Sequence, residues 1–229
     1  MNRTPWLTFS LPLLLAACGD ESAPNDAGAL VDTPQALLAL APDDVRGALE
    51  TAYRHVIVVR HAQRDPECGD ISCPLTPEGE AAVARLGLLL EGPRFDAAYA
   101  SAACRTAATA HAAGVRPVVY RVVDELTEGC AALDLEPGDY TRTQAQTDVT
   151  ASPVPWTLIA DHSNFVCEWP AALGADLLDV CLSGTIEETN YGDIFWLYQP
   201  AEGAGWGIVH LVDAFATDEP ATQARGGAP

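Results

Sequence analysis

The stretch VIVVRH at residues 56–61 decides how this chain can fold. Four consecutive β-branched residues are typical of a strand that is buried on both faces. Such strands form parallel sheets, whose ligand crevice lies beyond the carboxyl ends of the strands. Arg60 and His61 follow the four apolar residues directly. We therefore expect a guanidinium and an imidazole at the sheet edge where a ligand can bind.

Strands and helices alternate through the rest of the chain. Apolar runs predict further strands at 95–100, 118–123, 156–160, 194–198 and 207–212. Helices are predicted at 34–53, from Thr76 onward, at 102–113 and at 165–178. This alternation predicts an α/β domain, a three-layer sandwich with a mostly parallel central sheet and helices on both faces.

Polar clusters follow several of these strands where each one ends. Ser101 and Arg105 follow the second strand, Asp124 and Glu125 follow the third, and residues 161–164 (DHSN) follow the fourth. The carboxyl ends of parallel strands meet at one edge, so these groups should converge on a polar site.

Four motifs in order resemble the histidine phosphatase (phosphoglycerate-mutase-like) superfamily, over residues 55–212. They are Arg60-His61 after the first strand, LTPEG at residues 75–79, SAACRTA at residues 101–107, and His162 after the fourth strand. The resemblance implies that His61 is a nucleophile that accepts the phosphoryl group. An imidazole nitrogen can attack phosphorus and so divide hydrolysis into two displacements.

The same resemblance assigns the residues that hold the phosphoryl group. It implies that Arg60, Arg105 and His162 bind the phosphoryl oxygens, and Arg64 stands where related proteins often place another phosphate-binding residue. Guanidinium groups suit this task because they bind such oxygens in a fork.

The leaving oxygen also needs a proton. Residues 123–129 (VDELTEG) resemble a segment in which many superfamily members place an acid. The resemblance points to Glu125, with Asp124 and Glu128 as alternatives. A carboxyl in such a cleft can have a raised pKa and act as a general acid.

Two features depart from the superfamily pattern. Position 161 is Asp where related proteins usually have Gly. Its carboxylate is expected either to favour the imidazolium form of His162 or to point away as a simple strand end. The formal net charge of −20, with Arg as the only basic residue, is the second departure. It argues against sequence-independent nucleic-acid binding and against polyanionic substrates.

The amino-terminal segment is predicted to target the protein to the cell envelope. Residues 1–18 combine Arg3, a short apolar run and the ending Leu-Ala-Ala-Cys. This resembles a bacterial lipoprotein signal with Cys18 as the lipidated residue, and an ordinary signal peptide cut nearby is the alternative. Residues 19–33 suit a flexible tether, and residues 34–229 are predicted to form the domain. We expect a lipid anchor on the periplasmic side or the cell surface.

Six cysteines remain if Cys18 carries lipid. An even number in an oxidising compartment predicts disulfides, most simply Cys68–Cys73, Cys104–Cys130 and Cys167–Cys181. Buried free thiols are the alternative. No CxxC pair or Cys-His cluster has the spacing of a zinc site.

Taken together, the motifs predict a phosphatase that hydrolyses small phosphomonoesters through a phosphohistidine, without metal or cofactor. A catalytically silent module that binds phosphate or a phosphoprotein is the alternative. Mutase activity is a third interpretation, which export disfavours because its substrates are cytoplasmic metabolites.

Overall fold

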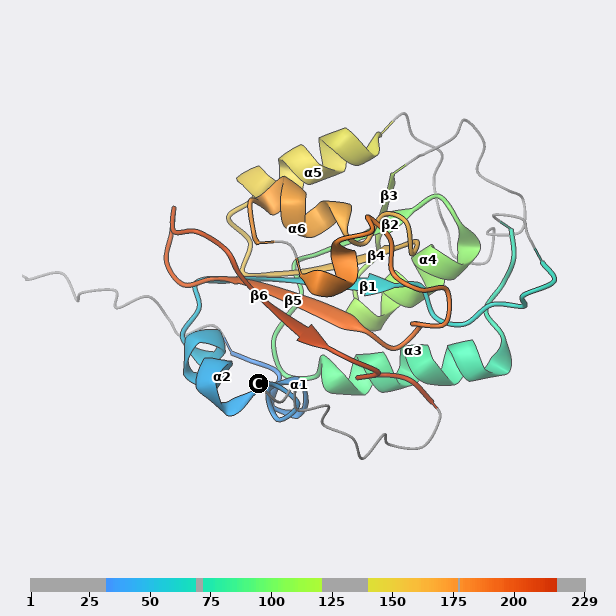
Figure 1. The fold of residues 1–229 in the computed structure, drawn as a ribbon, viewed down its shortest axis with the longest axis horizontal. Coiled ribbons are helices and arrows are strands. Elements are labelled where there is room, and N and C mark those ends of the chain that lie inside the picture. The colour runs from blue at the N-terminus through green and yellow to red at the C-terminus, as the bar shows by residue number, and fades with distance from the viewer. Residues whose placement is uncertain (1–31, 69–71, 121–139, 177, 218–229) are drawn as a thin grey trace, which may run out of the picture.

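The computed structural model describes residues 32–68, 72–120, 140–176 and 178–217. Its centre is a sheet of six strands in the order β3-β2-β4-β1-β5-β6 (Figure 1). The strands are β1 (Arg54–Arg60), β2 (Ala97–Ser101), β3 (Val118–Tyr120), β4 (Trp156–Asp161), β5 (Ile194–Gln199) and β6 (Gly207–Leu211).

Most of the sheet is parallel. Strand β1 pairs in parallel with β4, which pairs in parallel with β2, and β2 does so with β3. Strand β5 runs antiparallel to both β1 and β6. The predicted α/β class with a mostly parallel sheet is therefore confirmed, and one reversed strand makes the sheet mixed.

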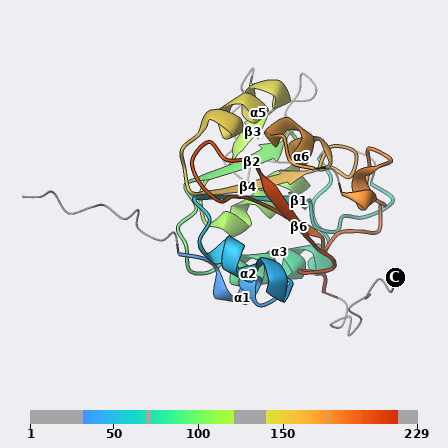
Figure 2. The same cartoon turned by 60° about the vertical axis from the view of Figure 1, so that its left-hand side comes forward.

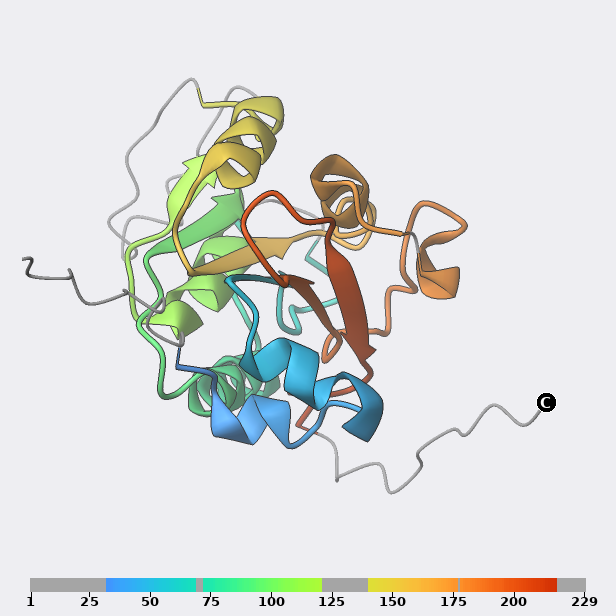
Figure 3. The ribbon, with the colours of Figure 1, turned by 90° about the vertical axis from the view of Figure 1, so that its left-hand side faces the viewer.

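Helices cover both faces of the sheet, as Figures 2 and 3 show. One face is covered by α1 (Gln35–Leu38), α2 (Asp43–Glu50), α3 (Pro77–Leu89) and α4 (Cys104–Ala110), which share a hydrophobic cluster with inward residues such as Ile57 and Leu158. The other face is covered by α5 (Arg142–Ala151) and α6 (Glu168–Leu173), which pack on Val56, Val58 and Ile159. Burial of β1 on both faces explains its uninterrupted apolar run.

Helix α3 begins where the sequence predicts. The side chain of Thr76 accepts a hydrogen bond from the amide of Gly79, and Pro77 occupies the first turn. Gly79 is required here because a Cβ would overlap the carbonyl oxygen of Gln63, in the loop that follows His61. The close approach fixes that loop against the start of the helix.

Two helix predictions need correction, and one helix was missed. The helix predicted at 34–53 is two short helices, α1 and α2, because Pro42 separates them. The helix predicted at 165–178 is shorter, since α6 ends at Gly174 in the left-handed conformation. Helix α5 was not predicted, although Thr141 and Gln144 form a capping box at its start.

Two of the predicted disulfides are present, Cys68–Cys73 and Cys167–Cys181, with Cα atoms 5.8 and 5.4 Å apart. Cys104 is also disulfide-bonded. Its predicted partner, Cys130, lies outside the described residues, as does Cys18, so the middle pairing and the lipid anchor remain predictions. Within the described part of the chain, no helix has the length and apolar character needed to cross a membrane.

Candidate active site

A cavity of about 240 Å³ opens at the carboxyl edge of the parallel strands. It is lined by residues from four separate segments: Arg60, His61, Arg64, Arg105, His162, Ser163, Asn164, Phe165 and Glu188. All five described residues to which the sequence assigned catalysis or phosphate binding lie in this lining. The structure thus brings them together, and their chemical roles remain proposals.

His61 is held in one tautomer by its backbone neighbours. Its amide donates to the carbonyl of Asp161 (2.9 Å), which extends the β1–β4 pairing by one residue. Its ring Nδ1 lies 2.8 Å from the carbonyl oxygen of Ala62. A carbonyl can only accept, so Nδ1 carries the proton and Nε2 carries the lone pair.

The unprotonated nitrogen of His61, Nε2, lies against the guanidinium of Arg105. Nε2 accepts a hydrogen bond of 3.2 Å from Nε of Arg105. Burial lowers the pKa of His61 well below its usual value, and the neighbouring His162, Arg105 and Arg60 lower it further. The imidazole is therefore neutral near pH 7, and its Nε2 lone pair is directed at the Arg105 guanidinium.

Arg105 is placed by the first turn of α4. Its side chain is buried. The helix is tied to the loop after β1, because the amide of Ala62 donates to the hydroxyl of Thr109 (3.0 Å) and that hydroxyl donates to the Arg105 carbonyl (2.7 Å). These two hydrogen bonds of the Thr109 hydroxyl hold the start of α4 against the loop after β1, and so they keep Arg105 close to His61.

Arg60 approaches the cavity from the last position of β1. Its guanidinium donates to the carbonyl of Glu187 (3.1 Å) and lies 4.0 Å from the ring centroid of Tyr191. Its Nε is buried without a hydrogen-bond partner. A buried donor of this kind is available to an anion that enters the cavity.

His162 packs against His61 in the lining of the cavity. The two imidazoles meet edge to face, with ring centroids 5.2 Å apart. Burial lowers the pKa of His162 to about 3, and Arg105, Arg142, Arg60 and Arg64 add to this effect. Both histidines are therefore neutral at neutral pH while the cavity holds no anion.

The expectation that Asp161 favours the imidazolium form of His162 is wrong. The fully buried carboxylate accepts hydrogen bonds from the Tyr120 hydroxyl (2.6 Å), the Trp169 indole (3.1 Å) and the backbone amide of His162 (2.9 Å). Arg142 lies 3.5 Å from the same carboxylate. Asp161 therefore holds the main chain of His162 and does not contact its ring nitrogens. Nor is Asp161 a simple strand end.

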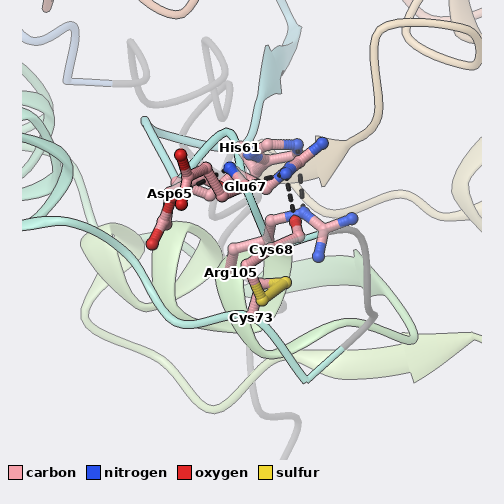
Figure 4. Close-up of a disulfide and its surroundings, with 7 residues drawn as sticks. His61, Asp65, Glu67, Cys68, Cys73 and Arg105 are labelled. Carbon is pink, nitrogen blue, oxygen red and sulfur yellow. Dashed lines mark hydrogen bonds between the residues drawn. A yellow bond between two sulfur atoms is a disulfide. The ribbon is translucent and has the colours of Figure 1, made fainter.

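Arg64 is held by the loop that the Cys68–Cys73 disulfide closes. Its guanidinium donates to the carbonyls of Asp65 (2.9 Å) and Cys68. Figure 4 draws the disulfide together with Arg105 and His61, both of which line the cavity. The disulfide therefore fixes the segment that carries the third arginine of the site.

Sequence reasoning missed three residues of this region. Phe165, which stacks on Arg142 (3.4 Å), and Glu188 line the cavity, and Tyr191 packs on Arg60. Glu188 and Tyr191 belong to the segment before β5, where no motif marks them. Phe165 follows His162 by three residues, so an aromatic residue this close to the motif was the signal available in the sequence.

The proposed acids, Glu125, Asp124 and Glu128, lie outside the described residues, and the assignment of the proton donor stays a prediction. Among the described residues, no three His, Cys, Asp or Glu side chains lie close enough together to hold a metal ion.

Residues 56–151 match the model of the histidine phosphatase superfamily (branch 1). This match confirms the resemblance that the motifs indicated, and it supports phosphatase activity in general. A search of curated proteins finds no significant match.

Three solved structures are among those that resemble part of this chain. A Nakamurella multipartitia protein, proposed to be the phosphohistidine phosphatase SixA, is 22% identical, with 68% of this chain and 93% of that chain covered and a TM-score of 0.43. YhfR of Bacillus stearothermophilus is 18% identical, with 70% of this chain and 96% of that chain covered and a TM-score of 0.44. A mycobacterial glucosyl-3-phosphoglycerate phosphatase is 16% identical, with 68% of this chain and 96% of that chain covered and a TM-score of 0.45.

Proposed function

We propose that this protein hydrolyses small phosphomonoesters through a phosphohistidine formed on Nε2 of His61. One observation carries the proposal: a neutral, buried imidazole presents its lone pair to a cavity lined by three arginines and a second histidine. A neutral imidazole is a nucleophile, and guanidinium groups stabilise the charge on a transferring phosphoryl group.

In the first step, the Nε2 lone pair forms a bond to phosphorus while the ester P–O bond breaks. The departing oxygen takes a proton, which we assign to Glu125. In the second step, water attacks phosphorus, the N–P bond breaks, and the carboxylate removes a proton from that water. The products are the alcohol and inorganic phosphate, and His61 returns to its neutral form.

Positive charge in this scheme comes from the protein. Arg60, Arg64 and Arg105 bind the equatorial oxygens, and an N–H of His162 donates a hydrogen bond to the same group. The scheme requires no metal. The segment 1–18 further supports the proposal that Cys18 carries lipid and that the domain works at the bacterial cell envelope, on a substrate available there.

A screen of the purified protein against small phosphomonoesters tests this function. We expect hydrolysis that vanadate, tungstate or phosphate inhibits and that a chelator leaves unchanged. Activity lost in chelator and restored by a divalent ion would contradict the metal-free scheme. Tight phosphate binding without turnover of any ester would favour the silent binding module.

A further inference from the structure

Glu188 is the one carboxylate that lines the cavity among the described residues. Every other charged residue in the described lining is a cation, and the rest are histidine, polar or aromatic. A carboxylate in this lining does not help to bind the phosphoryl dianion itself, because like charges repel. Its presence indicates a second recognition element.

The residues just before Glu188 are hydrogen-bonded to segments that carry the proposed phosphate-binding residues. The amide of Ile186, a buried residue, donates to the carbonyl of Ser163 (3.0 Å). The carbonyl of Glu187 accepts hydrogen bonds from Arg60 (3.1 Å) and from the amide of Asn190 (3.1 Å). Glu188 lies between these contacts, so its position relative to the arginines is set by the site itself.

The Glu188 side chain is exposed and acts on the cavity through its charge. It is among the groups whose charge raises the pKa of Arg60, so the two charges interact. A phosphoryl group bound by the arginines would leave the alcohol part of the substrate toward solvent, and Glu188 is the exposed charged residue of the described lining. A second anionic group there would be repelled, and a cationic group would be attracted.

The charge of the whole protein acts in the same direction. With a formal net charge of −20, the surface repels an anionic leaving group at long range as well. The three cationic residues suffice for one phosphoryl group. The substrate class that fits both features carries one phosphate and a positive charge.

We propose that Glu188 is a specificity-determining residue that binds an ammonium or guanidinium group on the alcohol part of the substrate. The preferred substrates are then cationic phosphomonoesters, of the aminoalkyl phosphate class. This inference rests on the proposed function for its relevance to turnover, and it makes a statement about binding that does not depend on turnover.

Three non-hydrolysable ligands of similar size test this statement by calorimetry on the whole protein. They are 2-aminoethylphosphonate, propylphosphonate and 3-phosphonopropionate, whose ends are cationic, neutral and anionic. We expect affinity to fall in that order. Glu188→Gln should weaken the cationic ligand about tenfold, as for a charge-assisted contact, and change the neutral one by less than about twofold. Glu188→Lys should reverse the order of the cationic and anionic ligands.

Glu67→Gln is the matched control, because it removes one exposed carboxylate near the cavity without changing its lining. It should leave the order of the three ligands intact. Equal affinities in the wild type, or an equal loss for all three ligands in Glu188→Gln, would overturn the inference. A wild type that hydrolyses no ester but keeps the order of affinities would reject the proposed function and leave the inference standing.

Discussion

The dipeptide Arg-His occurs at both ends of strand β1, as Arg54-His55 at its start and Arg60-His61 at its end. All four residues are buried. Burial lowers the pKa of both histidines, of His55 to about 3 and of His61 well below its usual value. Sequence type, burial and protonation state are therefore nearly the same at the two ends.

The partners of the two pairs differ. His55 stacks on Trp156, with ring centroids 3.9 Å apart, and its Nδ1 accepts from the indole of Trp196 (3.1 Å). Arg54 donates to the carbonyls of Val149 and Thr150 in the last turn of α5. The first pair is thus enclosed by the protein's own aromatic rings and carbonyls.

The second pair faces a cavity. His61 presents its lone pair to Arg105, and both Arg60 and His61 lie in the lining of that cavity. A buried, neutral imidazole is therefore a candidate nucleophile only where cations and open space surround it. In an α/β sheet, those conditions arise at the carboxyl end of the strand.

The largest expected effect is the difference in activity between the His61 and His55 variants. His61→Ala should lower kcat by about four orders of magnitude, because the remaining site acts with the nucleophile as a unit. His55→Ala should leave the activity of the folded protein intact and lower the free energy of unfolding by about 3 kcal/mol, since it opens a cavity beside Trp156. Steady-state kinetics and urea unfolding measure the two effects. Wild-type-like turnover in His61→Ala would reject the assignment of the nucleophile.

The two arginines sharpen the same comparison. Arg60→Ala should lower kcat/KM about 100-fold, because a charge-assisted donor to the transferring group is lost. Arg54→Ala should instead lower the free energy of unfolding by about 2 kcal/mol, since carbonyls at the end of α5 lose their donor. If Arg54→Ala impaired turnover more than Arg60→Ala did, the division of roles between the two ends would be wrong.

Asp161→Asn tests how the second histidine is held. The amide cannot accept from Tyr120, Trp169 and the His162 amide as the carboxylate does, and Arg142 loses its buried anion. We expect kcat/KM about tenfold lower, through a displaced His162, and a loss of about 2 kcal/mol in the free energy of unfolding. Tyr120→Phe, which removes one of these donors, should lower both kcat/KM and the free energy of unfolding by smaller amounts. An unchanged kcat/KM in Asp161→Asn would show that the network does not position His162.

The smallest effect is a difference in pH dependence. Folded His61 stays neutral below pH 6.5, whereas the unfolded chain protonates it, so the unfolded state binds more protons as the pH falls. Wild-type stability should therefore fall more steeply than that of His61→Ala between pH 6 and 4.5, by about 1.4 kcal/mol per pH unit. Parallel curves for the two proteins, or an NMR titration of His61 with a midpoint near 6.5, would contradict a neutral, desolvated nucleophile.

The strands and the motif residues could be predicted from the sequence because their signals are local. The run 56–59 identifies β1, and Arg60-His61 then falls at its carboxyl end. The disulfides Cys68–Cys73 and Cys167–Cys181 could also be predicted, since each closes a short loop.

The remaining features depend on contacts between distant segments. Arg60 meets the Glu187 carbonyl across 127 residues of sequence, and Asp161 finds partners in three other segments. No local pattern indicates that position 161 is buried and bonded rather than a strand end. Helix α5 was missed because it buries only Ala145 and Val149, too few for an apolar stripe.

Trapping the covalent intermediate tests the central claim most directly. The protein is mixed with a ³²P-labelled phosphomonoester, quenched in base within milliseconds, and mapped by peptide sequencing. We expect an alkali-stable, acid-labile label on the peptide that contains His61, absent from His61→Ala and present in His55→Ala. Hydrolysis of the ester by the wild type with no label at His61, or with the label on another residue, would contradict that claim.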